Sequence, residues 1–252
     1  MTVIPERAHW LKNIHLAKGY HRTKIPGEWC LMEAAAYIAG ESWTDHPVCV
    51  STVLTAYGIT LNDSWDDDQR QKLIPFIPRL LGTAGDGQDK ARSYLAIDWL
   101  LRTYTSTWVH LAGLTAEASA LREHTRIVDV PGVESIQTAL LAAQATLSPM
   151  YSEPQAHFAV RLAASVATAS AAVSAARSVT YSEPQAHFAV CLAASVATAS
   201  TAVATSAYSA AFRTDHLVAQ DALAPTVKML QASALDLLDA MTDPGLAAQE
   251  NV

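Results

Sequence analysis

Four side chains that could bind a metal ion or take part in catalysis lie near the N-terminus, at Cys30, Glu33, His46 and Cys49. Two residues separate Cys30 from Glu33, and two separate His46 from Cys49, so each pair fits on one helical turn or at a helix start. Zinc accepts such ligands, but a carboxylate is uncommon in structural zinc sites and a lone cysteine is more often a small core residue. We therefore favour a polar pocket over a metal site, and the cofactor is left unassigned.

Glu33 is the single charge in residues 29–39, a segment that is apolar on every face. Such a segment is typical of a helix that is buried all round. Since a buried carboxylate needs hydrogen-bond partners, we expect Glu33 to accept hydrogen bonds from His46 or from a nearby backbone amide. The binding residues predicted from this pattern are Glu33, Asp45, His46 and Cys49. We favour a role in fixing the conformation of the loop over contact with a small ligand.

A hydrolytic triad could be drawn from Cys30 or Cys49 with His46 and Asp45. Working triads, however, are assembled from groups that converge in space, and sequence neighbours rarely form one. The chain also has neither a G-x-S-x-G nucleophile elbow nor a G-x-x-x-x-G-K-[ST] phosphate-binding loop. No catalytic residue is assigned, and a small metal-dependent hydrolase using the Glu33, His46 and Cys49 region stays an alternative.

Proline, glycine and N-cap residues divide the first half of the chain into about four to five helices. Three aspartates near Trp65 complement the dipole of a helix start, so they are not interpreted as a metal site. A compact helical domain over residues 1–126 would position the candidate site. The helices expected here cover residues 29–39 with Gly40 as the stop, a segment from Pro47 to Tyr57 closed by Gly58, a helix capped by Ser64, residues 90–112 and residues 116–123.

The second half contains a tandem duplication, because residues 151–170 and 181–200 differ only at Arg161 and Cys191. Each copy opens with a capping-box pattern and a first-turn proline and continues in alanine, which predicts an antiparallel pair of helices. A C-terminal helix opened by Pro225 would close this region, residues 133–245. Each Å² of buried apolar area contributes roughly 25 cal/mol of stability, and alanine side chains bury little area. A hairpin made mostly of alanine would therefore be only marginally stable alone, and we expect it to associate into a homo-oligomer.

A membrane span is a competing interpretation of residues 185–212, which contain no Asp, Glu, Lys or Arg. Many serines and threonines and the lack of an aromatic belt favour a water-soluble helix, so no membrane contact is expected. The net charge of −7 argues against an extended nucleic-acid surface. Three cysteines and no secretory signal favour a reducing, cytoplasmic location.

Four stretches of the sequence are distinctive, namely EWCLMEAAAYIAGESWTDHPVCVS, IPRLLGT, DWLLR and LAPTVKMLQASALDLLD. They resemble a family of uncharacterised proteins from actinobacteria and their phages, with matches at Trp29, Cys30, Glu33, Asp45, His46, Pro47, Cys49, Pro78, Arg79, Asp98 and Trp99. The resemblance covers about residues 28–114 and 222–241, and it departs at Thr52, where a proline is expected. It implies a phage-associated source and an all-helical layout, but no reaction.

Together these patterns predict an all-α protein with an N-terminal helical domain, an alanine-rich antiparallel helical hairpin and a C-terminal helix. A non-enzymatic binding or protein-interaction protein is the favoured function, with a host protein or a small molecule as the partner. The alternatives are a protein that sequesters a nucleotide-type molecule against a host process, and the metal-dependent hydrolase described above.

Overall fold

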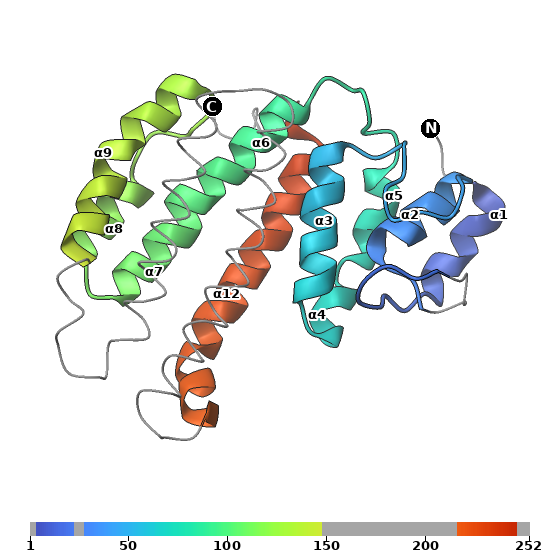
Figure 1. Cartoon of the computed structure of the whole chain (residues 1–252), viewed down its shortest axis with the longest axis horizontal. Helices are drawn as coiled ribbons and strands as arrows, with labels where there is room; N and C mark the ends of the chain where they lie inside the picture. Colours follow the sequence, from blue (N-terminus) through green and yellow to red (C-terminus); the bar gives the residue numbers. More distant parts are fainter. Residues whose placement is uncertain (1–3, 23–27, 148–215, 246–252) are drawn as a thin grey trace. The chain divides into compact units, whose positions relative to one another are not determined.

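The computed structural model describes residues 4–22, 28–147 and 216–245. These residues form helices joined by loops, and their one β-type pairing is an isolated parallel bridge between Leu16 and Trp29 (Figure 1). The predicted all-α fold is therefore confirmed. The alanine-rich hairpin and the membrane span considered for the same stretch lie outside the described residues. None of the helices in the described ranges is long and apolar enough to cross a bilayer.

The chain divides into two compact units. Unit 1 combines residues 1–93 with residues 235–252, and unit 2 contains residues 94–234. The division falls inside two helices, α6 (Asp89–Asp98) and α12 (His216–Thr242). The domain boundary expected at residues 126–133 stays a prediction.

Unit 1 contains α2 (Leu31–Ala39), the apolar helix expected from the sequence. Eight of its nine residues are buried, and Gly40 ends it with a left-handed φ of 81°, as predicted. Cys30 caps its start through the thiol, which accepts a hydrogen bond from the Glu33 amide. The other complete elements of unit 1 are α1 (Pro5–Ala8), η1 (His9–Lys12), α3 (Thr52–Ser64), α4 (Asp67–Gln71), η2 (Ile74–Phe76) and α5 (Ile77–Leu80).

Helix α3 corrects the prediction of a helix from Pro47 that ends at Gly58. It begins at Thr52, where the hydroxyl of Ser51 accepts a hydrogen bond from an amide of the first turn, and Gly58 lies in its middle. A Cβ atom at Gly58 would lie 2.4 Å from Met32 Cε and 2.9 Å from the Leu31 side chain. Gly58 therefore serves close packing against α2 and does not stop the helix.

Helix α4 is capped by Asp66 and not, as predicted, by Ser64. The Asp66 carboxylate accepts a hydrogen bond from the Gln69 amide at 2.8 Å, and Asp67 and Asp68 occupy the first turn. Asp outranks most residues at this position because its carboxylate also interacts favourably with the helix dipole. The three aspartates thus have the structural role that the sequence suggested.

Unit 2 continues from α6 into a π-helical segment, η3 (Trp99–Thr105), followed by α7 (Ser106–Leu111). The helix predicted over residues 90–112 is present, but the π segment was not expected. A π-helix holds more residues per turn than an α-helix, so the 3.6-residue register fails beyond it. Leu111, which lies in α7 beyond the π segment, is 38% exposed.

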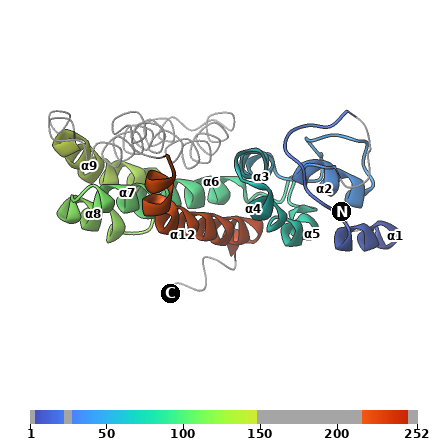
Figure 2. The ribbon, with the colours of Figure 1, turned by 90° about the horizontal axis from the view of Figure 1, so that it is seen from below.

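The helices α7, α8 (Thr115–Arg122) and α9 (Val130–Leu147) of unit 2 lie side by side (Figures 1 and 2). Pro131 lies in the first turn of α9, where a missing N–H costs no hydrogen bond. Pro225, which was predicted to open the last helix, lies instead inside α12, on an exposed position. The predicted start of the last helix was therefore wrong.

A buried arginine ties the last turns of α12 to unit 1. The Arg92 side chain is fully buried, and its Nε donates to the carbonyl of Met241 at 2.9 Å. Its two Nη atoms pair with Asp86 at 2.5 Å and with Asp89 at 2.9 Å. Arg79 also pairs with Asp239, but both of these side chains are about half exposed. Unit 1 is thus completed by residues far along the chain.

Candidate functional site

The Glu33 carboxylate lies fully buried in the first turn of α2, and both of its oxygens are occupied. Oε1 accepts a hydrogen bond from the His21 amide at 2.6 Å, and Oε2 accepts one from the Cys30 amide at 2.8 Å. The His21 ring lies against the same carboxylate, with Nδ1 2.9 Å from Oε2. The expected backbone donors are therefore present, and Glu33 holds the chain segment around His21 against α2.

His46 is not the imidazole that pairs with Glu33. Its Nδ1 lies 2.8 Å from Asp45 Oδ1, and its side chain is 71% exposed, so His46 belongs to the surface loop. The prediction failed because His21 belongs to a segment that periodicity does not describe. Cys49 is buried, and its carbonyl accepts hydrogen bonds from the amides of Gly82 and Ala84.

The four residues that could have formed a zinc site therefore have separate roles. Cys30 and Glu33 cap α2 together, His46 pairs with Asp45, and Cys49 anchors the loop at Gly82. Across the described ranges, no group of three or more histidine, cysteine, aspartate and glutamate side chains is placed to hold a metal ion.

Burial keeps both described thiols protonated. It raises the pKa of the Cys30 thiol far above its ordinary value, and the adjacent Glu33 carboxylate adds to the rise. Burial, together with a hydrogen bond to Glu41, raises the pKa of Cys49 to about 12. Since the thiolate is the nucleophilic form, neither cysteine is activated for catalysis.

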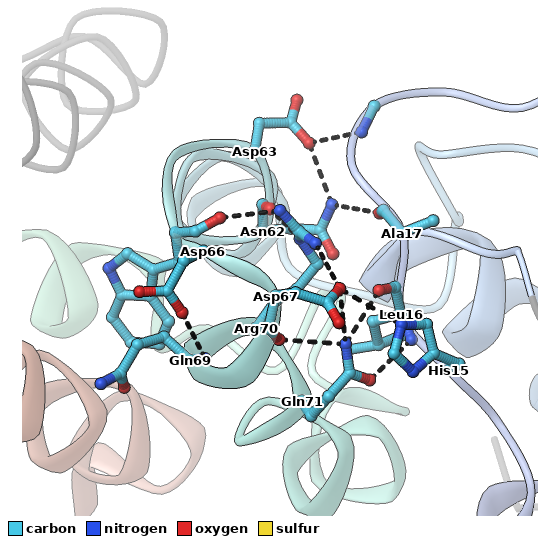
Figure 3. Close-up of polar contacts among 12 residues, drawn as sticks. His15, Leu16, Ala17, Asn62, Asp63, Asp66, Asp67, Gln69, Arg70 and Gln71 are labelled. Carbon is cyan, nitrogen blue, oxygen red and sulfur yellow. Dashed lines mark hydrogen bonds and ion pairs between the residues drawn. The ribbon is translucent and has the colours of Figure 1, made fainter.

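A second set of contacts fixes the N-terminal arm, which we define as residues 13–22. The side-chain amide of Gln71 pairs with the Leu16 backbone, donating at 3.0 Å and accepting at 2.8 Å (Figure 3). The Asn62 amide donates to the Ala17 carbonyl at 2.9 Å. Because these contacts satisfy backbone groups that lack secondary-structure partners, α3 and α4 hold the arm in one position.

Asp63 and Arg70 complete this support. Asp63 Oδ1 accepts hydrogen bonds from the Gly19 amide at 2.8 Å and from the Asn62 side chain at 2.9 Å (Figure 3). The Arg70 guanidinium donates to the carbonyls of Asn62 and Trp65, which links the end of α3 to α4. The arm therefore presents Gly19 and its neighbour Tyr20 beside the end of α3.

A small pocket opens where the arm, α2, α3 and the loop after α2 meet. Its volume is about 20 Å³, room for a single water-sized group. Tyr20, whose side chain remains 54% exposed, contributes to the lining. We call this site the acidic pocket, because its polar lining includes the carboxylates of Asp45 and Asp63 together with Tyr20, Cys30 and Asn62.

Of the predicted binding residues, only Asp45 lines the acidic pocket. Glu33 lies behind it as the support of α2, through Cys30, and neither His46 nor Cys49 contributes to the lining. Tyr20 and Asp63 were not predicted, because no periodicity or motif connects the arm to the end of α3. The one usable signal was the Asn62-Asp63 pair, whose side chains commonly bond to backbone groups.

Comparisons with known proteins found no matching family model, no similar curated protein and no similar solved structure. In the described part of unit 1, the acidic pocket has carboxylates with an oxygen that forms no hydrogen bond within the described chain, next to an exposed aromatic side chain.

Proposed function

We propose that this chain is a non-enzymatic binding protein that holds its partner at the acidic pocket of unit 1. The observation that carries the proposal is a contrast between two kinds of carboxylate. The buried Glu33 has both oxygens occupied by the arm and α2, whereas Asp45 and Asp63 each use only Oδ1 within the described chain. The Glu33 carboxylate thus serves to hold the fold together. The oxygens that remain available to a partner are Oδ2 of Asp45 and Oδ2 of Asp63, at the pocket.

The state of the cysteines supports binding over catalysis. Cys30 lines the pocket, but its thiol accepts the Glu33 amide hydrogen bond and has a raised pKa. A protonated, hydrogen-bonded thiol is a poor nucleophile. Sequestration of a nucleotide and metal-dependent hydrolysis stay predictions, since no contact described above favours either of them.

The exposed aromatic side chain at the pocket is consistent with a partner surface. Tyr20 lines the pocket and is 54% exposed. Aromatic side chains, tyrosine among them, are enriched in protein interfaces. A partner held at the pocket would therefore contact the Tyr20 ring as well.

Two further parts of the proposal rest on sequence patterns alone. The duplicated segments, residues 151–170 and 181–200, would mediate self-association, and the family resemblance gives a phage-associated source. Sedimentation equilibrium on the intact chain tests the first part. A molecular mass that rises with protein concentration is expected, whereas a monomer at every concentration would contradict it.

Binding and turnover can be tested in one experiment on the intact protein. A panel of small ammonium, carboxylate and nucleotide compounds is titrated by calorimetry, and each mixture is then analysed by mass spectrometry for chemical change. We expect at least one class to bind without conversion, with binding lost in Tyr20→Ala. Conversion of any bound compound would overturn the non-enzymatic assignment, and no binding by any class would remove the pocket from consideration.

A further inference from the structure

We infer that the imidazole of His21 is a site of covalent modification, which takes an uncharged, activated acyl group onto Nε2. Donors of this class carry the acyl group on a thioester or an acid anhydride. Glu33 is the positioning residue, because its carboxylate fixes the ring. The inference goes beyond the proposed binding function and does not depend on it, since neither aspartate of the acidic pocket takes part.

The orientation of the His21 ring is fixed on both sides of the residue. The His21 amide donates to Glu33 Oε1 at 2.6 Å, and ring Nδ1 lies 2.9 Å from Oε2 of the same carboxylate. The His21 carbonyl accepts the Trp43 indole hydrogen bond at 2.6 Å. Because the carboxylate also accepts from the Cys30 amide, we assign it as the acceptor and Nδ1 as the donor. In the neutral ring the free lone pair is therefore on Nε2.

The carboxylate behind the His21 ring is fully buried. In the other histidine–carboxylate pairs of the described chain the carboxylate remains partly exposed, as Asp45 does beside His46. Among the described residues no lysine or arginine pairs with Glu33. A positive charge that forms on the His21 ring during attack is therefore stabilised by a preorganised carboxylate that neither water nor another cation screens.

Nε2, the nitrogen that would attack, is open to solvent. The His21 side chain is 21% exposed. Nε2 has no hydrogen-bond partner among the described residues, and it is not one of their buried atoms that lack a partner. An imidazole that is oriented through one nitrogen and accessible at the other has the arrangement of a nucleophile with its orienting carboxylate.

The transfer forms one bond and breaks one. The Nε2 lone pair adds to the carbonyl carbon of the donor, the bond from that carbon to the leaving group breaks, and the leaving group departs as an anion with the electron pair. The Nδ1 hydrogen stays between the ring and Glu33. The acylated ring is therefore a cation paired with the buried carboxylate, and the acyl group remains on the protein.

The surroundings of the ring favour an acyl group over a phosphoryl group. Phosphoryl transfer spreads negative charge over three oxygens, which need several hydrogen-bond donors. The amides of His21 and Cys30 already donate to Glu33. An uncharged acyl donor has a single carbonyl oxygen and no charge for the Glu33 carboxylate to repel.

Timed exposure of the intact protein to diethyl pyrocarbonate, an uncharged acid anhydride, tests the inference at mildly alkaline pH, where an ordinary imidazole is uncharged. Mass spectrometry of tryptic peptides gives the two rates separately, because residues 19–22 and 25–70 each contain one histidine. We expect His21 to be acylated about tenfold faster than His46, as for an imidazole with an orienting carboxylate. Exposure alone predicts the opposite order, since His46 is 71% exposed. In urea the two rates should become equal.

Glu33→Gln should slow the acylation of His21 about tenfold and leave that of His46 unchanged, because the ring loses its orienting carboxylate. Glu134→Gln, at an exposed position of α9, is the matched control and should change neither rate. Circular dichroism verifies that each variant is folded. Potassium phosphoramidate is the phosphoryl probe, and it should modify His21 no faster than His46.

The comparison of folded and urea-treated wild-type protein decides the matter without any variant. Slower acylation of His21 in the folded protein than in urea would show that Glu33 only packs the ring in place, and would overturn the inference. An unchanged rate in folded Glu33→Gln would do the same. Preferential modification of His21 by phosphoramidate, without preferential acylation, would overturn the choice of an acyl group. Binding at the acidic pocket is measured separately and does not depend on any of these results.

Discussion

The buried carboxylate of Glu33 and the imidazole of His21 lie 2.9 Å apart, and the backbone amide of His21 donates to the same carboxylate at 2.6 Å. A side chain of α2 thus holds both a main-chain and a side-chain group of the N-terminal arm. The Trp43 indole adds a third contact, because its Nε1 donates to the His21 carbonyl at 2.6 Å. The arm therefore depends on Glu33 for its position beside the acidic pocket.

Glu33→Gln should destabilise the protein by about 3 kcal/mol. The glutamine amide keeps one acceptor oxygen but puts an NH2 group in place of the other, so either the Cys30 amide or the His21 amide loses its acceptor and a buried donor is left unsatisfied. Urea denaturation followed by circular dichroism measures the loss of unfolding free energy. Glu134→Gln, at an exposed position of α9, is the control and should change stability little. Equal stabilities of the two variants would show that Glu33 does not hold the arm.

Arg92→Met should destabilise the protein by about 3–5 kcal/mol, because it leaves Asp86, Asp89 and the Met241 carbonyl without their shared donor. Arg79→Met removes an ion pair of similar chemistry that is about half exposed, and should cost about 0–1 kcal/mol. Both variants are compared by urea denaturation. A larger loss for Arg79→Met than for Arg92→Met would contradict the assignment of Arg92 as the anchor of α12.

The stability of the protein should depend on the ionisation of Asp86. The Arg92 hydrogen bond holds the pKa of Asp86 below its ordinary value. The folded protein therefore binds this proton less readily than the unfolded chain, so the contribution is fully present above about pH 4 and is lost as the pH falls through the depressed folded pKa. Unfolding free energies from neutral to acidic pH should decline less steeply in Asp86→Asn, and an equally steep decline in the variant and the wild type would contradict this role of Asp86.

Gly58→Ala should destabilise the wild-type protein more than a protein with a smaller residue at position 32. The new methyl group would meet Met32 Cε at 2.4 Å and the Leu31 side chain at 2.9 Å, an overpacking that costs about 1–3 kcal/mol against a helix-propensity gain of about 1 kcal/mol. In the Met32→Ala background only the Leu31 contact remains, so Gly58→Ala should cost less stability there. A double-mutant cycle in thermal unfolding measures this difference, and additive effects would contradict the close packing of α2 and α3.

Cys30 and Cys49 should resist alkylation in the native protein. Both thiols are buried, and burial raises the pKa of each, that of Cys49 to about 12, so little thiolate is present near neutral pH. Peptide mapping after iodoacetamide treatment should find both residues unlabelled in buffer and labelled in urea. Rapid labelling of Cys30 in buffer would show that the pocket exposes an active thiol.

The sequence was sufficient to predict α2, its end at Gly40 and the burial of Glu33, because periodicity and capping are local properties. It predicted that Glu33 would have a backbone donor but chose His46 instead of His21 as the imidazole. A contact between residues far apart in the sequence leaves no local pattern, so the His21–Glu33 pair was not predicted. The hydrogen bond from the Gly19 amide to Asp63 was missed for the same reason.

The sequence rules that assign helix boundaries to glycine and proline also failed at two positions inside helices. Gly58 and Pro225 both resemble helix boundaries in sequence, yet both lie inside helices. Gly58 is required by the approach of α2, and Pro225 is tolerated on an exposed position of a long helix. A residue that ends an isolated helix can therefore be placed inside one when tertiary contacts compensate.

The Arg92–Met241 contact has a consequence for biosynthesis and for changes in chain length. During translation the Arg92 guanidinium cannot donate to the Met241 carbonyl until α12 has left the ribosome. Truncation before Met241 should therefore leave unit 1 incompletely folded and prone to degradation. Residues 94–234, which form unit 2, are an insertion in the chain between the two segments of unit 1. Gain or loss of residues within that insertion would leave every partner of Arg92 in the sequence, because Asp86, Asp89 and Met241 all belong to unit 1.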